Sequence, residues 1–99
     1  MQPDYPARFT RDTGGTEAEW LGRLVGACKG QPIEIGAHRA TIAIDDGALV
    51  LHWRPLPPRR IALMSMPRLE VEFDFENLSD EARTRFMRYF DLYMQRGGG

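Results

Sequence analysis

The chain has 99 residues and a formal net charge of −1 at pH 7, with 42% hydrophobic and 27% charged residues. This length and composition are typical of one globular domain and exclude wholesale disorder. The near-zero net charge gives no overall attraction to nucleic acid or to acidic membranes. No apolar run is long enough to cross a bilayer or to act as a signal peptide, and the single cysteine cannot form an intrachain disulfide. We therefore expect a soluble, cytoplasmic protein.

The N-terminal residues are rich in turn formers. Two prolines and the pair Gly14–Gly15 lie among scattered charges in residues 1–15, which predicts a flexible N-terminal arm. The folded domain is then expected to span residues 16–96, followed by a flexible glycine tail at residues 97–99.

A helix is predicted to begin after Thr16. The Thr16 hydroxyl can accept a hydrogen bond from the backbone of the third helical residue, and Glu19 stands where a capping box requires an acid. Apolar residues follow at helical spacing, and Gly30 with Pro32 ends the pattern. This amphipathic helix needs an apolar surface to cover.

The clearest strand signal lies at residues 69–76, where apolar and acidic residues alternate without a break. Successive side chains of a strand point to opposite sides, so one face of this strand is apolar and the other is acidic. The apolar residues are Leu69, Val71, Phe73 and Phe75, and the acidic ones are Glu70, Glu72, Asp74 and Glu76. The strand therefore belongs to a sheet with one buried face.

Turn signals divide the preceding region into further strands. Asp46–Gly47 is a two-residue hairpin signal that pairs Ile44 with Leu49, and a turn at Gly36–Ala37 extends the same apolar face.

The stretch Arg54–Pro58 contains three prolines, so we expect a stiff connector to interrupt the sheet there. A strand over Arg59–Ser65 and a turn at Ser65–Pro67 then set Leu63 against Leu69 on the buried face.

A second helix is predicted to follow Ser79, which can cap it, with Asp80 and Glu81 in its first turn. Aromatic residues repeat at helical spacing from there to Gly97. The order helix, five strands, helix predicts an α+β fold. We expect a two-layer sandwich in which both helices pack on one face of a five-stranded antiparallel meander sheet.

No motif supports enzymatic activity. The sequence has no nucleophile elbow and no glycine-rich phosphate loop before a helix, and Cys28, His38 and His52 lack the spacing of a zinc site. Neighbouring carboxylates of residues 70–76 lie roughly 7 Å apart along the strand, too far to share one ion. We therefore expect no catalytic, cofactor-binding or metal-binding residues. The acidic face is interpreted as a solvated surface, with a docking surface for a basic partner as the alternative.

Two groups of residues are candidates for binding a partner. The first group consists of arginines that occur without any acid between Leu51 and Leu69: Arg54, Arg59, Arg60 and Arg68. The second group lies on the C-terminal helix, where methionines widen the apolar stripe and arginines flank it: Met87, Met94, Arg85 and Arg88. Such combinations are typical of protein interfaces.

These residues indicate a small non-enzymatic interaction module. We expect it to bind a protein partner or a second copy of itself through the C-terminal helix and the Arg/Pro-rich connector. The alternative is a nucleic-acid-binding domain that uses the arginines of residues 54–68, because guanidinium groups pair well with phosphates.

Two segments, LHWRPLPPRR at residues 51–60 and RFMRYFDLYMQRGGG at residues 85–99, resemble segments of small proteobacterial proteins that have no assigned function. The resemblance covers only the second half of the chain. It implies a bacterial protein and brings no activity or site residue with it.

Overall fold

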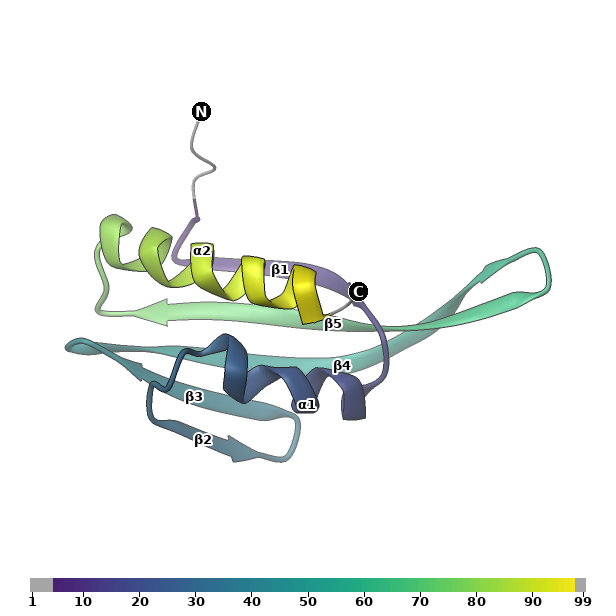
Figure 1. Ribbon diagram of the computed structural model, residues 1–99, viewed down its shortest axis with the longest axis horizontal. Coiled ribbons are helices and arrows are strands. Elements are labelled where there is room, and N and C mark those ends of the chain that lie inside the picture. The colour runs from purple at the N-terminus through teal and green to yellow at the C-terminus, as the bar shows by residue number, and fades with distance from the viewer. Residues whose placement is uncertain (1–4, 98–99) are drawn as a thin grey trace.

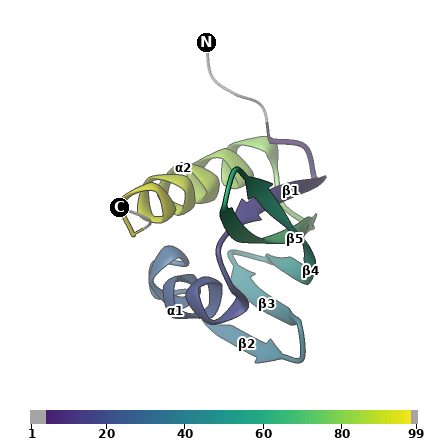
Figure 2. The ribbon, with the colours of Figure 1, turned by 90° about the vertical axis from the view of Figure 1, so that its right-hand side faces the viewer.

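Five strands and two helices make up the computed structural model, which describes residues 5–97 (Figure 1). In chain order they are β1 (Arg8–Gly14), α1 (Glu17–Ala27), β2 (Ile33–Gly36), β3 (Arg39–Ile44), β4 (Gly47–Ile61), β5 (Met64–Glu76) and α2 (Asp80–Gly97). The strands form one antiparallel sheet in the order β1-β5-β4-β3-β2, and both helices lie on one side of it (Figure 2). This confirms the predicted α+β fold.

Strand β1 is the main departure from the predicted topology. Residues 8–14, which we expected in a flexible arm, pair with β5 from Arg8 opposite Asp74 to Gly14 opposite Arg68. The sheet is therefore a four-stranded meander completed by β1 at one edge, and α1 carries the chain toward the other edge. The predicted domain boundary at residue 16 is wrong, because a paired strand precedes it. The other parts of the predicted arm and tail, residues 1–4 and 98–99, lie outside the described residues.

Strand β1 lacks a clear sequence signal because its inward positions are not all apolar. Phe9 stacks on Phe73 with 4.7 Å between the ring centroids, but the next inward residue is Arg11. The Arg11 guanidinium lies 5.3 Å and 5.4 Å from the centroids of the Phe9 and Phe73 rings. It also donates two hydrogen bonds to Asp91 of α2, at 2.6 Å and 3.1 Å. A paired, half-buried arginine thus takes the place of an apolar residue.

The core lies between the sheet and the two helices. The predicted alternation of β5 is confirmed: its four apolar side chains are buried, while its acidic side chains are exposed or half-buried on the other face. The helices contribute further buried residues, notably Trp20, Leu24, Met87 and Phe90.

Both helices begin at the predicted caps. Thr16 and Glu19 form the capping box, in which the Glu19 backbone N–H donates to the Thr16 hydroxyl at 3.2 Å and the Thr16 backbone N–H donates to the Glu19 carboxylate at 2.8 Å. The Ser79 hydroxyl accepts from the backbone N–H of Ala82 at 3.1 Å. Helix starts are readable from sequence because the capping contacts are local.

The two short hairpins keep the predicted apolar face, but their registers differ from the prediction by two residues. The β3–β4 turn is Asp45–Asp46, so Ile44 lies opposite Gly47 rather than Leu49. Gly47 is required for close approach, because a Cβ there would lie 2.1 Å from the backbone oxygen of Glu76. A shift of two residues returns every side chain to the same face, so the assignment of the buried face stays correct.

The proline-rich segment continues the sheet, whereas the sequence predicted an interruption. Strand β4 runs through it and remains paired with β5 as far as Ile61 opposite Met64, with one irregularity between Leu56 and Arg59. The turn that follows is Ala62–Leu63, so its centre lies three to four residues before that of the predicted Ser65–Pro67 turn. The predicted separate strand and its buried register are wrong.

The prolines are tolerated because they face an open edge. The backbone N–H of Trp53 donates to the carbonyl of His38, just before β3 begins, at 3.0 Å. Alternate residues of an antiparallel strand direct their backbone groups to the same side, so Pro55 and Pro57 face the edge that β3 leaves open. Their missing N–H groups therefore remove no hydrogen bond between β4 and β5.

Candidate partner-binding arm

The distal part of the β4–β5 hairpin projects beyond the helices (Figure 1). We call residues 56–68 the β4–β5 arm, and it lies along the longest dimension of the molecule, which is 46 Å. Four large apolar side chains near its end are exposed, and we call them the apolar tip: Ile61 (56% exposed), Leu63 (fully exposed), Met64 (65%) and Met66 (46%). Sequence reasoning missed this feature, because it assigned Leu63 to the buried face.

The turn at the apolar tip has an unusual composition. Ala62 adopts φ 54°, a left-handed conformation that residues with a Cβ rarely adopt, and Leu63 follows it. The other two hairpin turns place polar residues, His38 and Asp45, in this conformation. Glycine and asparagine satisfy such a turn best, so the backbone does not explain the choice of alanine and leucine. An apolar turn in full solvent exposure points to a contact outside the chain.

Prolines interrupt the backbone donors along both open edges of the β4–β5 hairpin. Pro55 and Pro57 face the edge beyond β3, and Pro67 faces the edge beyond β1, where its carbonyl accepts a hydrogen bond from Gly15 at 2.8 Å. Prolines on exposed edges prevent the addition of another strand. The prolines therefore hinder strand addition, which favours contact with a partner through side chains.

The four arginines predicted for this region differ in how fully they are paired. Arg54 donates to Glu70 at 2.8 Å. Arg68 contacts Asp12 at 2.5 Å and donates to the Pro57 carbonyl at 2.8 Å. Arg59 lies 3.9 Å from the same Asp12 carboxylate, and Arg60 forms no ion pair with any residue in the described range 5–97. Arg59 and Arg60 thus keep donors for an external anion.

A groove of about 630 Å³ lies between the arm and the start of α1. We call it the arm groove. Its apolar surface includes Ile61, Met66 and Pro67, and three arginines reach it from different elements: Arg23, Arg59 and Arg68. The structure thus joins two arginines of the predicted set with a third, Arg23, that sequence reasoning did not select. Only the fold brings α1 next to the arm, so no sequence signal identifies Arg23.

The predicted residues of the C-terminal helix do not form a common surface with the arm. Met87 is fully buried in the core, so its assignment to a partner surface is wrong, and Met94 is partly buried against the core. Arg88 is exposed. Arg85 donates to Asp45 of the β3–β4 turn at 3.2 Å, and that turn lies at the end of the molecule opposite the arm (Figure 1).

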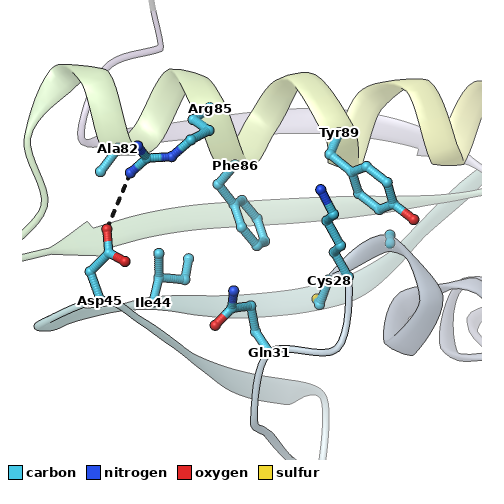
Figure 3. A pocket seen from close by; sticks show the side chains of 10 residues that line it. Cys28, Gln31, Ile44, Asp45, Ala82, Arg85, Phe86 and Tyr89 are labelled. Carbon is cyan, nitrogen blue, oxygen red and sulfur yellow. Dashed lines mark hydrogen bonds and ion pairs between the residues drawn. The ribbon is translucent and has the colours of Figure 1, made fainter.

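A smaller hollow of about 270 Å³ lies between α2, the end of α1 and the β3–β4 turn (Figure 3). Phe86 and Ile44 line it, and Arg85 reaches across it toward Asp45. Cys28 also lines it but is completely buried, and this burial raises the pKa of its thiol to about 12. The thiol stays protonated at neutral pH, so Cys28 is not an activated nucleophile.

The histidines are held separately by carboxylates. His38 Nδ1 lies 2.7 Å from Glu17 Oε2, which also accepts a hydrogen bond from the Trp53 indole at 2.6 Å. His52 Nδ1 lies 3.7 Å from Glu72 Oε1 on the outer face of the sheet. Within residues 5–97, no three His, Cys, Asp or Glu side chains form a group that could hold a metal ion.

Comparison with models of protein families finds no match for this sequence, and comparison with curated proteins finds none either. Neither helix in the described part of the chain has the length and apolar character needed to cross a membrane.

Proposed function

We propose that this protein is a small non-enzymatic interaction module that binds a protein partner, or a second copy of itself, through the β4–β5 arm. The observation that carries the proposal is the apolar tip, four large apolar side chains exposed together at the end of a projecting hairpin. Exposed apolar clusters rimmed by polar residues mark protein-binding surfaces. Two of the four side chains are methionines, whose flexible thioethers adapt to varied apolar surfaces.

The energetics favour occupation of the apolar tip. Burial of one Leu, Ile or Met side chain contributes roughly 1.5–3 kcal/mol. The tip therefore offers several kilocalories per mole to a partner, from which the cost of ordering the complex is subtracted. The C-terminal helix is not part of this proposal, because the side chain of Met87 is buried in the core and cannot contact a partner.

The side chains around the arm favour protein over nucleic acid. Single-stranded nucleic acid binds on exposed aromatic rings, but residues 54–68 contain no aromatic residue. The adjacent Trp53 is buried and its indole donates to Glu17. Arg54 and Arg68 are already paired with carboxylates.

Site-specific photo-crosslinking tests the proposal. Leu63 is replaced by p-benzoylphenylalanine, the protein is produced in its native host and the cells are irradiated. Leu92, which is 53% exposed on α2, serves as the matched control position. We expect an adduct of defined mass from position 63 and none from position 92. A mass of two chains identifies self-association, and any other defined mass identifies a different protein.

A second variant links the adduct to the apolar tip. Met64→Asp in the crosslinking protein places a charge beside the probe and is expected to remove the adduct. Equal adducts from positions 63 and 92, or no adduct from position 63, would overturn the proposal.

A further inference from the structure

The arm groove combines charge and apolar surface in a way that defines the chemistry of a partner. Its volume of about 630 Å³ falls within the range of roughly 300–1,000 Å³ that is typical of binding pockets. Ile61 and Met66 give it an apolar wall that is continuous with the apolar tip. An occupant must therefore carry apolar side chains.

The carboxylates of the arm groove are already engaged. Asp12 accepts from Arg68 at 2.5 Å, and Glu19 accepts from the Thr16 backbone N–H at 2.8 Å within the capping box. Arg23 forms no ion pair within the described residues, although its charge helps the Thr16 hydrogen bonds to lower the pKa of Glu19. Arg59 reaches Asp12 only at 3.9 Å. The groove thus presents guanidinium donors that its own acids do not saturate, which favours carboxylates on the occupant.

We infer that the arm groove binds a peptide segment of a partner protein that carries both carboxylate and apolar side chains. This rests on the proposed function and narrows it to one partner chemistry. The carboxylates pair with Arg59 and Arg23, and the apolar side chains pack on Ile61 and Met66. The segment contacts the arm chiefly through side chains, because the prolines interrupt the open strand edges.

Peptide selection on the intact protein tests this chemistry directly, since it does not require the partner protein itself. A random library of 12-residue peptides is displayed and selected on the wild-type chain, then counter-selected on Arg59→Glu and on Ile61→Asp. Peptides retained by the wild type and lost by both variants are expected to be enriched in Asp or Glu together with Leu, Ile, Phe or Met. Selected sequences without acidic enrichment, or no selected sequences, would overturn the inference.

Fluorescence anisotropy with the best selected peptide then measures how much each substitution changes Kd. Loss of one charge-assisted contact is expected to raise Kd at least about tenfold for Arg59→Glu. Arg39→Glu makes the same charge change outside the groove, and Ile35→Asp matches Ile61→Asp in an exposed strand position. Both controls are expected to leave Kd within about twofold. Equal weakening by variant and control would contradict the inference.

Two further probes separate other classes of ligand. Vesicles of phosphatidylcholine with phosphatidylserine, and a single-stranded oligonucleotide, are titrated at low and moderate salt. One outcome would overturn the inference in favour of lipid or nucleic acid: no acidic peptides are selected, and the wild-type protein binds one of these probes while the Arg59→Glu protein does not. An undiminished yield of the Leu63 crosslink in the Arg59→Glu protein would also overturn the inference while leaving the proposed function intact.

Discussion

Both halves of the β4–β5 hairpin are paired antiparallel, on either side of the irregularity between Leu56 and Arg59, but they lie in different surroundings. In the body half, pairs such as Leu51 with Phe73 and Trp53 with Val71 are buried beneath the helices. In the arm half, Ile61 pairs with Met64 and both are exposed. Strand pairing therefore does not decide which side chains are buried. Met64 and Met66 alternate in step with Glu70 and Glu72, so they continue the face of β5 that points away from the helices. Burial therefore depends on the face of the sheet and on the layer that covers that face.

The lengths of the elements explain why the arm is uncovered. Strand β5 has 13 residues and spans about 43 Å, because a strand rises roughly 3.3 Å per residue. Helix α2 has 18 residues and spans only about 27 Å at 1.5 Å per residue, and α1 with 11 residues is shorter. Helices of these lengths cannot cover the whole hairpin. The uncovered part carries the apolar tip, and so becomes the surface available to a partner.

The largest expected effect is the difference in stability between two variants, each of which truncates one side chain in a different half of β5. Phe73 is buried against Phe9 and Phe90, so Phe73→Ala should lower the free energy of unfolding by roughly 3–5 kcal/mol. Met66 lies in the arm half of the same strand, and Met66→Ala should change it by less than about 0.5 kcal/mol. Urea unfolding followed by circular dichroism measures both. A comparable loss for the two variants would show that the arm belongs to the core.

A second prediction concerns the open edge of the arm. The double variant Pro55→Thr and Pro57→Thr restores two backbone N–H groups at that edge without touching the core. Its free energy of unfolding should fall by less than about 2 kcal/mol, because each proline restricts the unfolded chain by roughly 0.4–1 kcal/mol. Its self-association, measured by light scattering over a range of concentrations, should exceed that of the wild type.

Pro32→Thr, a proline substitution in the connection between α1 and β2, is the control and should leave self-association unchanged. If the double variant scatters no more than this control, the prolines do not protect the edge.

The smallest expected effect is a pH dependence at the junction of the two halves. The pKa of Glu17 is lowered from its ordinary 4.5, chiefly because its carboxylate accepts the Trp53 indole hydrogen bond and also because it contacts His38. A lowered folded-state pKa adds stability that is present above pH 4.5 and is lost as the pH falls through the folded-state value. Urea unfolding between about pH 7 and pH 3 should therefore show a shallower loss of stability for Glu17→Gln than for the wild type.

Glu34→Gln removes the same charge from the edge strand β2 and serves as the control. A slope for Glu17→Gln that equals the slope of this control would rule out the specific role of the indole contact.

Part of the candidate site could be predicted from sequence. The stretch between Arg54 and Arg68 stands out for its arginines, and it forms the projecting arm. The apolar tip was missed because the prediction required Ile61 and Leu63 to be buried with the rest of the sheet. The contribution of Arg23 was missed because α1 meets the arm only after the sheet has formed. Met87 was misassigned because the apolar stripe of α2 is wide, and only the packing of the helix decides which of its side chains are buried.

The sequence by itself determined the features whose physical causes are local. The Thr16 and Ser79 caps, the alternating faces of β5 and the sandwich of sheet and helices follow from contacts between residues near in sequence and from side-chain periodicity. Tertiary structure alone decided that β1 joins the sheet, because Arg11 is compatible with the interior only when Asp91 of α2 pairs with it. It also decided that the prolines face an open edge and that the helices end short of the arm, since both facts depend on which elements become neighbours.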